Sequence, residues 1–241
     1  MSDIERDGAH FSMMLPNILD LREQFKLSLH AGPNELADYD LRFAGQHLPG
    51  TLEIAAQLKF KHPQVHGDGR TSSWVMTTDQ LLLLQAPDAR HELLALSFKP
   101  SQLKLTDRNL ELLAIEREYW AVRSVNWLLI TTDLYEKSVA LTLRRTAPWA
   151  LGKAVETSAI SVAVDIVEST LGHSYTYTLN ALADQLGDVE TAQRNFWQAV
   201  WAGAIPLDLR RGWRPHLPIG LLSQEQFTAL NPVASRRSAW N

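Results

Sequence analysis

The sequence contains no cysteine, no long apolar run and no excess of positive charge, and each absence excludes a class of protein. Without cysteine the chain can form no disulfide and no thiolate metal site, which fits a reducing cytoplasm. No apolar run approaches the roughly 20 residues that a membrane-spanning helix needs, and the charged first residues exclude a secretory signal. We therefore expect a cytoplasmic protein with no membrane partner.

The net charge limits how the chain can bind nucleic acid. Lysine and arginine total 23 against 27 aspartates and glutamates, which gives a formal charge of −4, and neither half of the chain is basic. A protein that held DNA alone would carry a positive face that displaces counterions from the phosphates. If nucleic acid is the substrate, we expect a partner to supply much of the contact. The 241 residues suffice for one large domain or two ordinary ones.

The most informative stretch runs from Trp74 to Pro100, where two short apolar strands flank a polar turn over residues 85–91. Asp79 stands at the start of the first strand and Lys99 at the end of the second, so both charges lie at the edge of a buried sheet. Side chains alternate along a strand, which puts Ser97 on the face of Lys99. This geometry can place an anionic metal ligand beside a lysine.

Other segments of the first half complete an α/β pattern. Residues 17–29 alternate as a solvated edge strand does, residues 30–47 form loop, and Thr51 caps a helix over 52–58. A helix over 106–123 leads into an apolar strand at 125–131, and this crossover implies neighbouring parallel strands. The charged residues of that helix are expected to form a solvated face: Arg108, Glu111, Glu116, Arg117, Glu118 and Arg123.

Two groups of polar residues near the N-terminus have structural interpretations. Ser2 and Glu5 have the spacing of a capping box, which predicts a helix that starts there and gives Glu5 a capping role. His62, His66 and Asp68 suggest a metal site, but their spacing lacks a compact ligand arrangement, so we favour a solvated loop.

The sheet-like pattern stops around residues 144–149, and we place a domain boundary at residue 148. Beyond it the pattern predicts helices over 155–171, over 179–186 with Thr178 as its cap, and from Asp188 to Trp201.

Two brief strands near 205–209 and 214–222 follow, and three helices with a hairpin are typical of a winged-helix domain. The third helix carries one cation, Arg194, and two tryptophans, so we favour core packing or a protein–protein surface over DNA reading. The tail around Arg236 and Arg237 is expected to be mobile.

An acid, a turn and a lysine at a strand end follow the layout of the PD-(D/E)XK nuclease core, although this pattern alone also recurs by chance. Several further segments are similar to the TnsA endonuclease subunit of heteromeric transposases. The resemblance lies in residues 2–5, 17–25, 51–55, 61–63, 75–79, 97–100 and 110–120, and in the Asn-Trp-Leu-Leu-Ile-Thr that begins at 126. Their order and spacing match from residue 2 to about 132, and the C-terminal part is similar only in architecture.

The resemblance implies a catalytic set of a helix glutamate, a strand aspartate and a Gln-x-Lys, with a main-chain carbonyl at Phe98. Glu5 matches the glutamate, Asp79 the aspartate and Lys99 the lysine. Ser97 stands where the family has glutamine, and its shorter hydroxyl would reach a metal only through water or a local shift. The implied cofactor is Mg²⁺, replaceable by Mn²⁺, with Glu5, Asp79 and Ser97 as its ligands. Family members also usually have a leader before the helix that carries the glutamate.

The expected architecture is therefore a restriction-endonuclease-like α/β domain over residues 1–148, with a mixed sheet and flanking helices. A mainly α winged-helix-like domain for partner binding follows over residues 149–241. The resemblance implies a bacterial Mg²⁺-dependent DNA endonuclease that cuts the non-transferred strand at the 5′ ends of a transposon in cut-and-paste transposition. It also implies three partners, which are transposon-end DNA, a DDE transposase that cuts and joins the 3′ ends, and an AAA+ ATPase regulator on the C-terminal domain.

Two alternatives remain open at this point. Ser97 and the abrupt N-terminus also fit a catalytically impaired scaffold that bridges the transposase and its ATPase regulator. A stand-alone repair nuclease would nick naked DNA without partners, and the charge balance disfavours it.

Overall fold

The contacts of the computed structural model divide the chain into two compact units, and residues 2–88, 90–212 and 214–240 are described. The sheet unit consists of residues 17–131 with the residues from 238 onward. The helical unit consists of the residues up to 16 with residues 132–237. None of the helices in the described chain is long and apolar enough to cross a bilayer.

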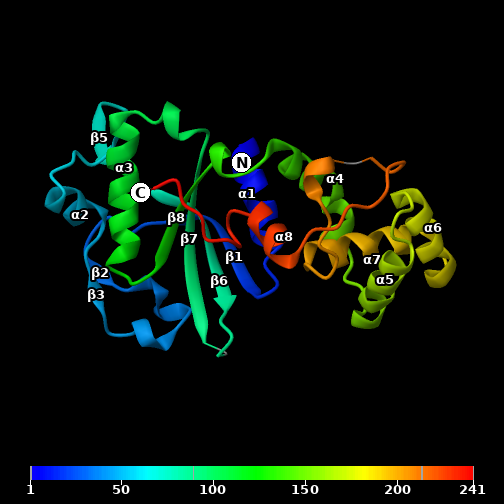
Figure 1. The fold of residues 1–241 in the computed structure, drawn as a ribbon. Coiled ribbons are helices and arrows are strands. Elements are labelled where there is room, and N and C mark those ends of the chain that lie inside the picture. Colours follow the sequence, from blue (N-terminus) through cyan, green and yellow to red (C-terminus); the bar gives the residue numbers. More distant parts are fainter. Residues whose placement is uncertain (1, 89, 213, 241) are drawn as a thin grey trace. The chain divides into compact units, whose positions relative to one another are not determined.

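A mixed sheet with the strand order β1–β6–β7–β8 forms the core of the sheet unit (Figure 1). β1 (Ile18–Lys26) pairs antiparallel with β6 (Thr77–Gln85), which pairs antiparallel with β7 (His91–Lys99). β8 (Asn126–Thr131) pairs parallel with β7. Both the hairpin and the parallel crossover agree with the expectations from the sequence.

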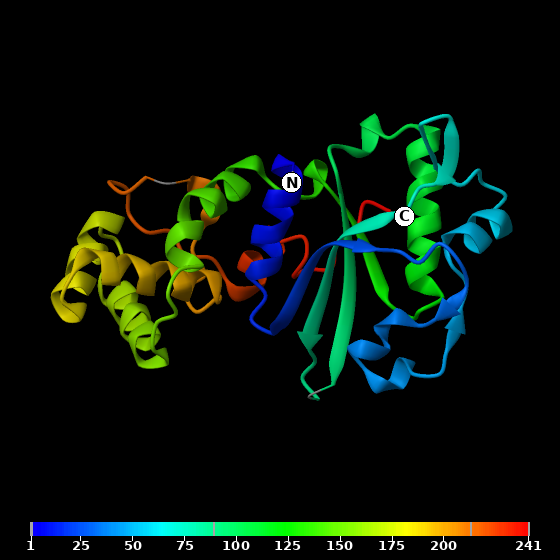
Figure 2. The same cartoon turned by 180° about the vertical axis from the view of Figure 1, so that it is seen from behind.

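Helix α3 (Asp107–Ala121) packs against the sheet (Figure 1 and Figure 2). The hydroxyl of Thr106 caps it by accepting the N–H of Asn109. Its residues Ile115 and Trp120 share a buried apolar cluster with Leu81 of β6 and Ala95 of β7. Since side chains alternate along a strand, Ser97 and Lys99 lie on the same face of β7 as Ala95.

Short elements connect the core strands. They are β2 (Gly32–Pro33), the 3₁₀ helices η1 (Glu35–Asp38) and η2 (Leu41–Phe43), β3 (His47–Leu48), α2 (Thr51–Gln57), β4 (Gln64–Gly67), β5 (Arg70–Ser73) and η3 (Gln102–Lys104). Helix α2 has Gly50 rather than Thr51 as its N-cap, because the Glu53 carboxylate accepts the Gly50 N–H at 3.0 Å. His66 lies on the exposed β4–β5 hairpin, where its ring contacts the Thr71 hydroxyl at 2.9 Å.

The C-terminal residues pack on β8 within the sheet unit. The Ala239 N–H donates to the Leu129 carbonyl at 2.8 Å, and the Leu129 N–H donates to the Ser238 hydroxyl at 3.1 Å. The ring of Trp240 lies 5.8 Å from that of Trp127. The sequence did not predict this packing after the Arg236–Arg237 tail.

The helical unit is built from helices and turns. Its elements are α1 (Asp3–Met13), η4 (Thr132–Leu134), α4 (Lys137–Ala150), α5 (Thr157–Ser169), α6 (Tyr175–Leu186), α7 (Val189–Trp201), η5 (Leu209–Arg211) and α8 (Gln224–Leu230). Arg144 of α4 forms an ion pair with the buried Asp7 of α1 at 2.5 Å, which ties these helices together. The units therefore divide near residues 16, 131 and 237, and residue 148 lies inside α4.

Two sequence expectations in this unit differ from the structure. Helix α6 begins at Tyr175, because the Ser174 hydroxyl accepts the Tyr177 N–H, while Thr178 is buried and bonds the Thr170 hydroxyl at 2.8 Å. The strands expected near 205–209 and 214–222 pair through a single isolated antiparallel bridge, Leu207 with Leu221, and Pro218 of the second segment bridges Ser174. Prolines at 206, 215 and 218 lack the N–H that a ladder needs. The winged-helix prediction is not confirmed.

Candidate active site

The strands β6 and β7 separate at the residues that carry the predicted site. Their pairing runs from Gln85 with His91 as far as Gln80 with Leu96, although both strands continue for three more residues. Beyond this point β6 pairs only with β1, and β7 only with β8. The Phe98 N–H is satisfied by the side chain of Asp79, whose Oδ2 accepts it at 2.7 Å. The carboxylate is thus fixed in the opening between the two strands.

Lys99 completes this arrangement. Its Nζ donates to Asp79 Oδ2 at 3.3 Å and to the Phe98 carbonyl at 3.0 Å. The Asp79 side chain is 10% exposed and that of Lys99 is 33% exposed, so the ammonium lies closer to solvent than the carboxylate. The structure therefore brings together the aspartate, the lysine and the main-chain carbonyl that the sequence proposed.

A cavity in the sheet unit contains this cluster. It is lined by Asp79, Lys99 and Glu116, with apolar walls that include Met76 and Leu113. Apolar walls lower the local dielectric and strengthen every electrostatic contact inside. The cavity is therefore a suitable place for charge chemistry.

Ser97 lies on the face of β7 that the sequence predicted, but its hydroxyl has protein partners. The side chain is 1% exposed. Its Oγ donates to Glu116 Oε1 at 2.5 Å and accepts from Trp127 Nε1 at 3.1 Å. Ser97 is therefore bonded to Glu116 and Trp127.

Glu116 lies in the core. The sequence pattern had predicted that it would lie on a solvated face of the helix, and this prediction is wrong. It is 5% exposed, and its Oε1 also accepts from the Thr78 hydroxyl at 2.7 Å and from Trp127 Nε1 at 3.3 Å. The helical repeat contained the signal: Glu116 falls between Leu113 and Trp120 on the apolar stripe of α3. A carboxylate on such a stripe must find donors inside the protein.

Burial governs the charge of this carboxyl group. Desolvation raises the pKa of Glu116 to about 7, against the lowering effect of the hydrogen bonds from Ser97 and Thr78. The negative charge of Asp79 adds to the increase, and the positive charge of Lys99 opposes it. Glu116 and Asp79 are thus electrostatically coupled.

Gln24 is a second residue that the sequence reasoning missed. It lies in β1 between the pairs Glu23–Gln80 and Phe25–Thr78, which keep one register, and its φ is +50°. Its Nε2 lies 3.4 Å from Asp79 Oδ1, and its Oε1 accepts the Thr77 hydroxyl at 2.9 Å. A residue with positive φ inside a strand is strained, and here the strained residue contacts the aspartate.

Glu5 lies on α1, which belongs to the helical unit. The predicted capping box is present: the Ser2 N–H donates to Glu5 Oε2 at 2.6 Å, and the Glu5 N–H donates to the Ser2 hydroxyl at 3.3 Å. The site described above is built by the sheet unit alone, and a catalytic role for Glu5 stays a prediction.

The oxygen donors of the sheet unit fit a small divalent cation. Asp79 Oδ2 and the Phe98 carbonyl lie within hydrogen-bond reach of one Lys99 Nζ, so one ion could contact both oxygens. Carboxylate and carbonyl oxygens are the ligands that Mg²⁺ prefers. Within the described residues, no three histidine, aspartate or glutamate side chains form a metal cluster, including His62, His66 and Asp68.

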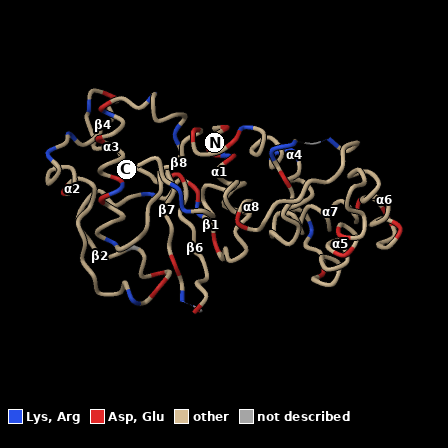
Figure 3. Tube along the Cα trace, in the orientation of Figure 1, with Lys and Arg blue, Asp and Glu red and all other residues tan. Residues whose placement is uncertain are grey.

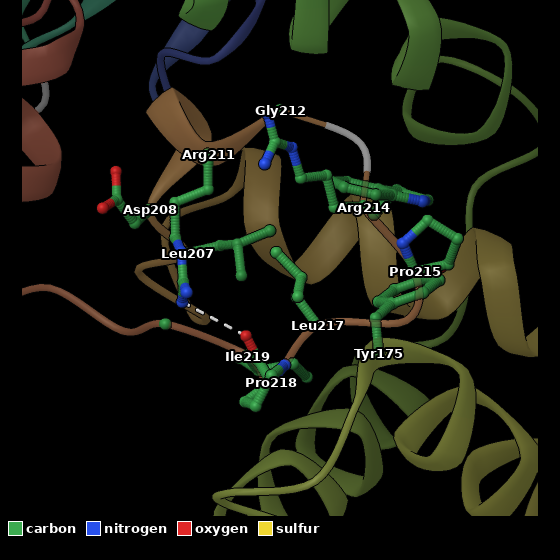
Figure 4. A pocket seen from close by; sticks show the side chains of 12 residues that line it. Tyr175, Leu207, Asp208, Arg211, Gly212, Arg214, Pro215, Leu217, Pro218 and Ile219 are labelled. Atoms are coloured by element: carbon green, nitrogen blue, oxygen red, sulfur yellow. Dashed lines mark hydrogen bonds between the residues drawn. The ribbon is translucent and has the colours of Figure 1, made fainter.

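A separate pocket in the helical unit lacks this chemistry. Tyr175 of α6 and residues from the segments 207–212 and 214–220 line it, and the Arg211 guanidinium donates to the Pro218 carbonyl at 3.2 Å (Figure 4). Its acidic residue, Asp208, is paired with Arg210 at 2.7 Å. The pocket contains none of the predicted site residues.

Two comparisons with known proteins found similarity to TnsA-type proteins. Residues 15–132 match the family model "TnsA-like endonuclease N terminal". These residues are therefore similar to the N-terminal domain of TnsA-like endonucleases. Asp79, Ser97, Lys99 and Glu116 all lie within this TnsA-like domain, and Glu5 precedes it.

A curated relative shows the same similarity. The chain is 28% identical over 158 residues to the transposon Tn7 transposition protein TnsA of Escherichia coli. The match covers 65% of this chain and 46% of the relative, so the chain spans about half the length of that protein.

Proposed function

We propose that this protein is the transposon endonuclease subunit that cuts the non-transferred strand at the 5′ ends of an element by Mg²⁺-dependent hydrolysis. The observation that carries the proposal is the meeting of the Asp79 carboxylate, the Phe98 carbonyl and the Lys99 ammonium where β6 and β7 separate. This cluster lies inside the TnsA-like domain.

The residues of the site have distinct chemical roles in this proposal. Asp79 and the Phe98 carbonyl would hold the cation, which when bound polarises the scissile phosphate and acidifies a water. Lys99 lines the same cavity, and in this proposal its ammonium stabilises the negative charge that develops on the phosphate. The Phe98 N–H fixes Asp79 in position, so the carboxylate needs little rearrangement during the reaction.

The proposed partners are transposon-end DNA, a DDE transposase that cuts and joins the 3′ ends, and an AAA+ ATPase regulator that docks on residues 149–241. The relative's name connects it with transposition. The formal charge of −4 and the mixed charges along both units (Figure 3) support a protein that depends on partners to hold DNA.

Single substitutions test the proposed active site in a complex reconstituted with the transposase. Asp79→Ala and Lys99→Ala should each abolish 5′-end nicking, because one removes the cation ligand and the other the donor to the developing charge. Asp88→Ala is the matched control, since Asp88 lies in the β6–β7 turn and pairs with Arg90 at the surface. Nicking by the Asp79→Ala or Lys99→Ala protein at the parent rate would refute the proposal.

A non-enzymatic scaffold is the second candidate, and Ser97 is the observation that favours it. The resemblance implies glutamine at this position, and the hydroxyl of Ser97 is already bonded to Glu116 and Trp127. A scaffold would bridge the transposase and the ATPase without binding metal at Asp79. Calorimetric titration with Mn²⁺ separates the two, because only the endonuclease requires binding that depends on Asp79.

A further inference from the structure

The strand β6 changes face where it passes the site. The side chain of Leu81 belongs to the buried cluster that β6 shares with α3, and the Thr78 hydroxyl donates to Glu116 of the same helix at 2.7 Å. Thr78 and Leu81 are three positions apart, and in a regular strand they would point to opposite faces of the sheet. The alternation of β6 is therefore interrupted between them, beside Asp79.

The neighbouring strand β1 changes face at the same level. The Arg22 guanidinium lies over the ring of Tyr39, 5.6 Å from its centroid, and Phe25 packs against the same buried cluster as Tyr39. Arg22 and Phe25 are also three positions apart, yet the pairs on either side of Gln24 keep one register with β6. The left-handed φ of Gln24, +50°, lies between them and accounts for the change of face.

Core packing does not explain why this strained position carries a glutamine. Gln24 is exposed and lies on the edge strand of the sheet. A glycine would adopt the same positive φ without steric strain. Strained residues persist where their surroundings require them, and they cluster at functional sites. The contacts of the Gln24 side chain are what a glycine at this position would lack.

The amide of Gln24 contacts the second oxygen of Asp79. Oδ2 of this carboxylate accepts from the Phe98 N–H at 2.7 Å and from Lys99 Nζ at 3.3 Å. Gln24 Nε2 lies 3.4 Å from Oδ1, and the Thr77 hydroxyl donates to Gln24 Oε1 at 2.9 Å. Because a carboxylate only accepts hydrogen bonds, the nitrogen of the amide has to face Asp79. The Thr77 hydroxyl, which donates to the amide oxygen, favours the same orientation.

We propose that Gln24 is a positioning residue of this site, whose left-handed backbone and amide together fix the rotation of the Asp79 carboxylate. The inference rests on the proposed endonuclease function and adds a residue that acts through Asp79. With Oδ1 held by the amide, Oδ2 is presented beside the Phe98 carbonyl, the other oxygen that would contact the cation. Groups that hold a metal ligand in its binding orientation raise the affinity of the site for the metal.

The structural alternative is that Gln24 only allows β1 to follow the change of face in β6. Two substitutions separate these roles. Gln24→Gly keeps the left-handed backbone and removes the amide. Gln24→Met keeps a side chain of similar length and the backbone strain but has no hydrogen-bond donor. If the role is only structural, the glycine variant should bind metal as the parent does.

Calorimetric titration of the full chain with Mn²⁺ is the test. Gln24→Gly and Gln24→Met should each weaken Mn²⁺ binding by about tenfold, the usual cost of removing a group that orients a metal ligand. Ser124→Gly is the matched control, because Ser124 is also exposed with a positive φ, +56°, and does not line the cavity of Asp79. It should bind as the parent does. A loss smaller than about threefold in either Gln24 variant would overturn the inference.

Thermal unfolding in EDTA separates positioning from folding. Gln24→Gly should unfold at the temperature of the parent or above it, because relief of the strain offsets the greater chain entropy of glycine. Weaker Mn²⁺ binding by a Gln24→Gly protein that is as stable as the parent supports the positioning role. Weaker binding together with a lower unfolding temperature would assign the loss to the fold and contradict the proposal.

Asp79→Asn distinguishes failure of this inference from failure of the proposed function. If Asp79→Asn loses Mn²⁺ binding while the two Gln24 variants keep it, the proposed function stands and the role of Gln24 is wrong. If the parent protein binds no Mn²⁺, or if Asp79→Asn binds it as the parent does, both proposals fall.

Discussion

At the scale of single residues, the sequence pattern predicted two charged residues of the site, Asp79 and Lys99, and did not predict the third, Glu116. Asp79 and Lys99 are conspicuous because each stands alone at the end of an apolar strand. Glu116 stands among other charges on α3, where a solvated face is the usual outcome. Only the sheet, with its Ser97 and Thr78 donors, makes burial of that carboxylate acceptable.

The raised pKa of Glu116 predicts how stability depends on pH. In the metal-free protein this carboxyl has a folded-state pKa of about 7 against 4.5 for the reference value. The folded state therefore binds the proton more tightly, and the stabilisation, present in full below pH 4.5, is lost as pH rises towards 7. Relative to Glu116→Gln, the parent should lose on the order of 3 kcal/mol across this window, since each pKa unit corresponds to about 1.4 kcal/mol.

Chemical denaturation in EDTA at a series of pH values measures this difference. Between pH 4.5 and 7, the free energy of unfolding of the parent should fall relative to that of Glu116→Gln. A constant difference across the series would show that Glu116 titrates normally in the folded protein.

At the scale of elements, the site depends on the separation of β6 and β7 and on the packing of α3. Sequence patterns predicted both strands, the crossover helix and the parallel β8, because apolar runs and helical repeats are local signals. They did not predict where the ladder stops, since this depends on the Asp79 carboxylate replacing a backbone partner for Phe98. The positive φ of Gln24 likewise had no signal in the sequence.

The hairpin expected near residues 205–209 and 214–222 and the start of α6 also differ from what the sequence patterns predicted. Three prolines between residues 206 and 218 could have argued against a hairpin. Ser174 and Thr178 are both acceptable N-caps in the sequence, and the tertiary contact of Thr178 with Thr170 decides between them.

The apolar face of α3 should dominate the stability of the sheet unit. Ile115 is fully buried, and Ile115→Ala should destabilise the protein by about 2–5 kcal/mol through lost transfer energy and a residual cavity. Leu110→Ala on the same helix is the control, because Leu110 is exposed and should change stability much less. Urea denaturation gives both values, and equal effects would show that α3 is not anchored by this face.

At the scale of the whole molecule, the charge predicts dependence on partners. With a formal charge of −4, the chain releases few counterions on its own, so its intrinsic affinity for DNA should be low at physiological salt. We expect no detectable nicking of naked transposon-end DNA by the full chain alone, and nicking once the transposase is added.

Gel assays with and without the transposase check this dependence. Efficient nicking by the isolated chain at 0.15 M salt would favour a stand-alone repair nuclease and contradict the proposed partnership. The same assays in EDTA should show no nicking in either case, since the cation is removed.

The most direct test of the central claim maps the two strands of a transposon end separately in the reconstituted complex. With the parent chain we predict breaks at the 5′ ends and, from the transposase, breaks at the 3′ ends. With Asp79→Ala the 5′ breaks should disappear while the 3′ breaks remain. Continued 5′ cutting by the Asp79→Ala complex would contradict the assignment of the site between β6 and β7.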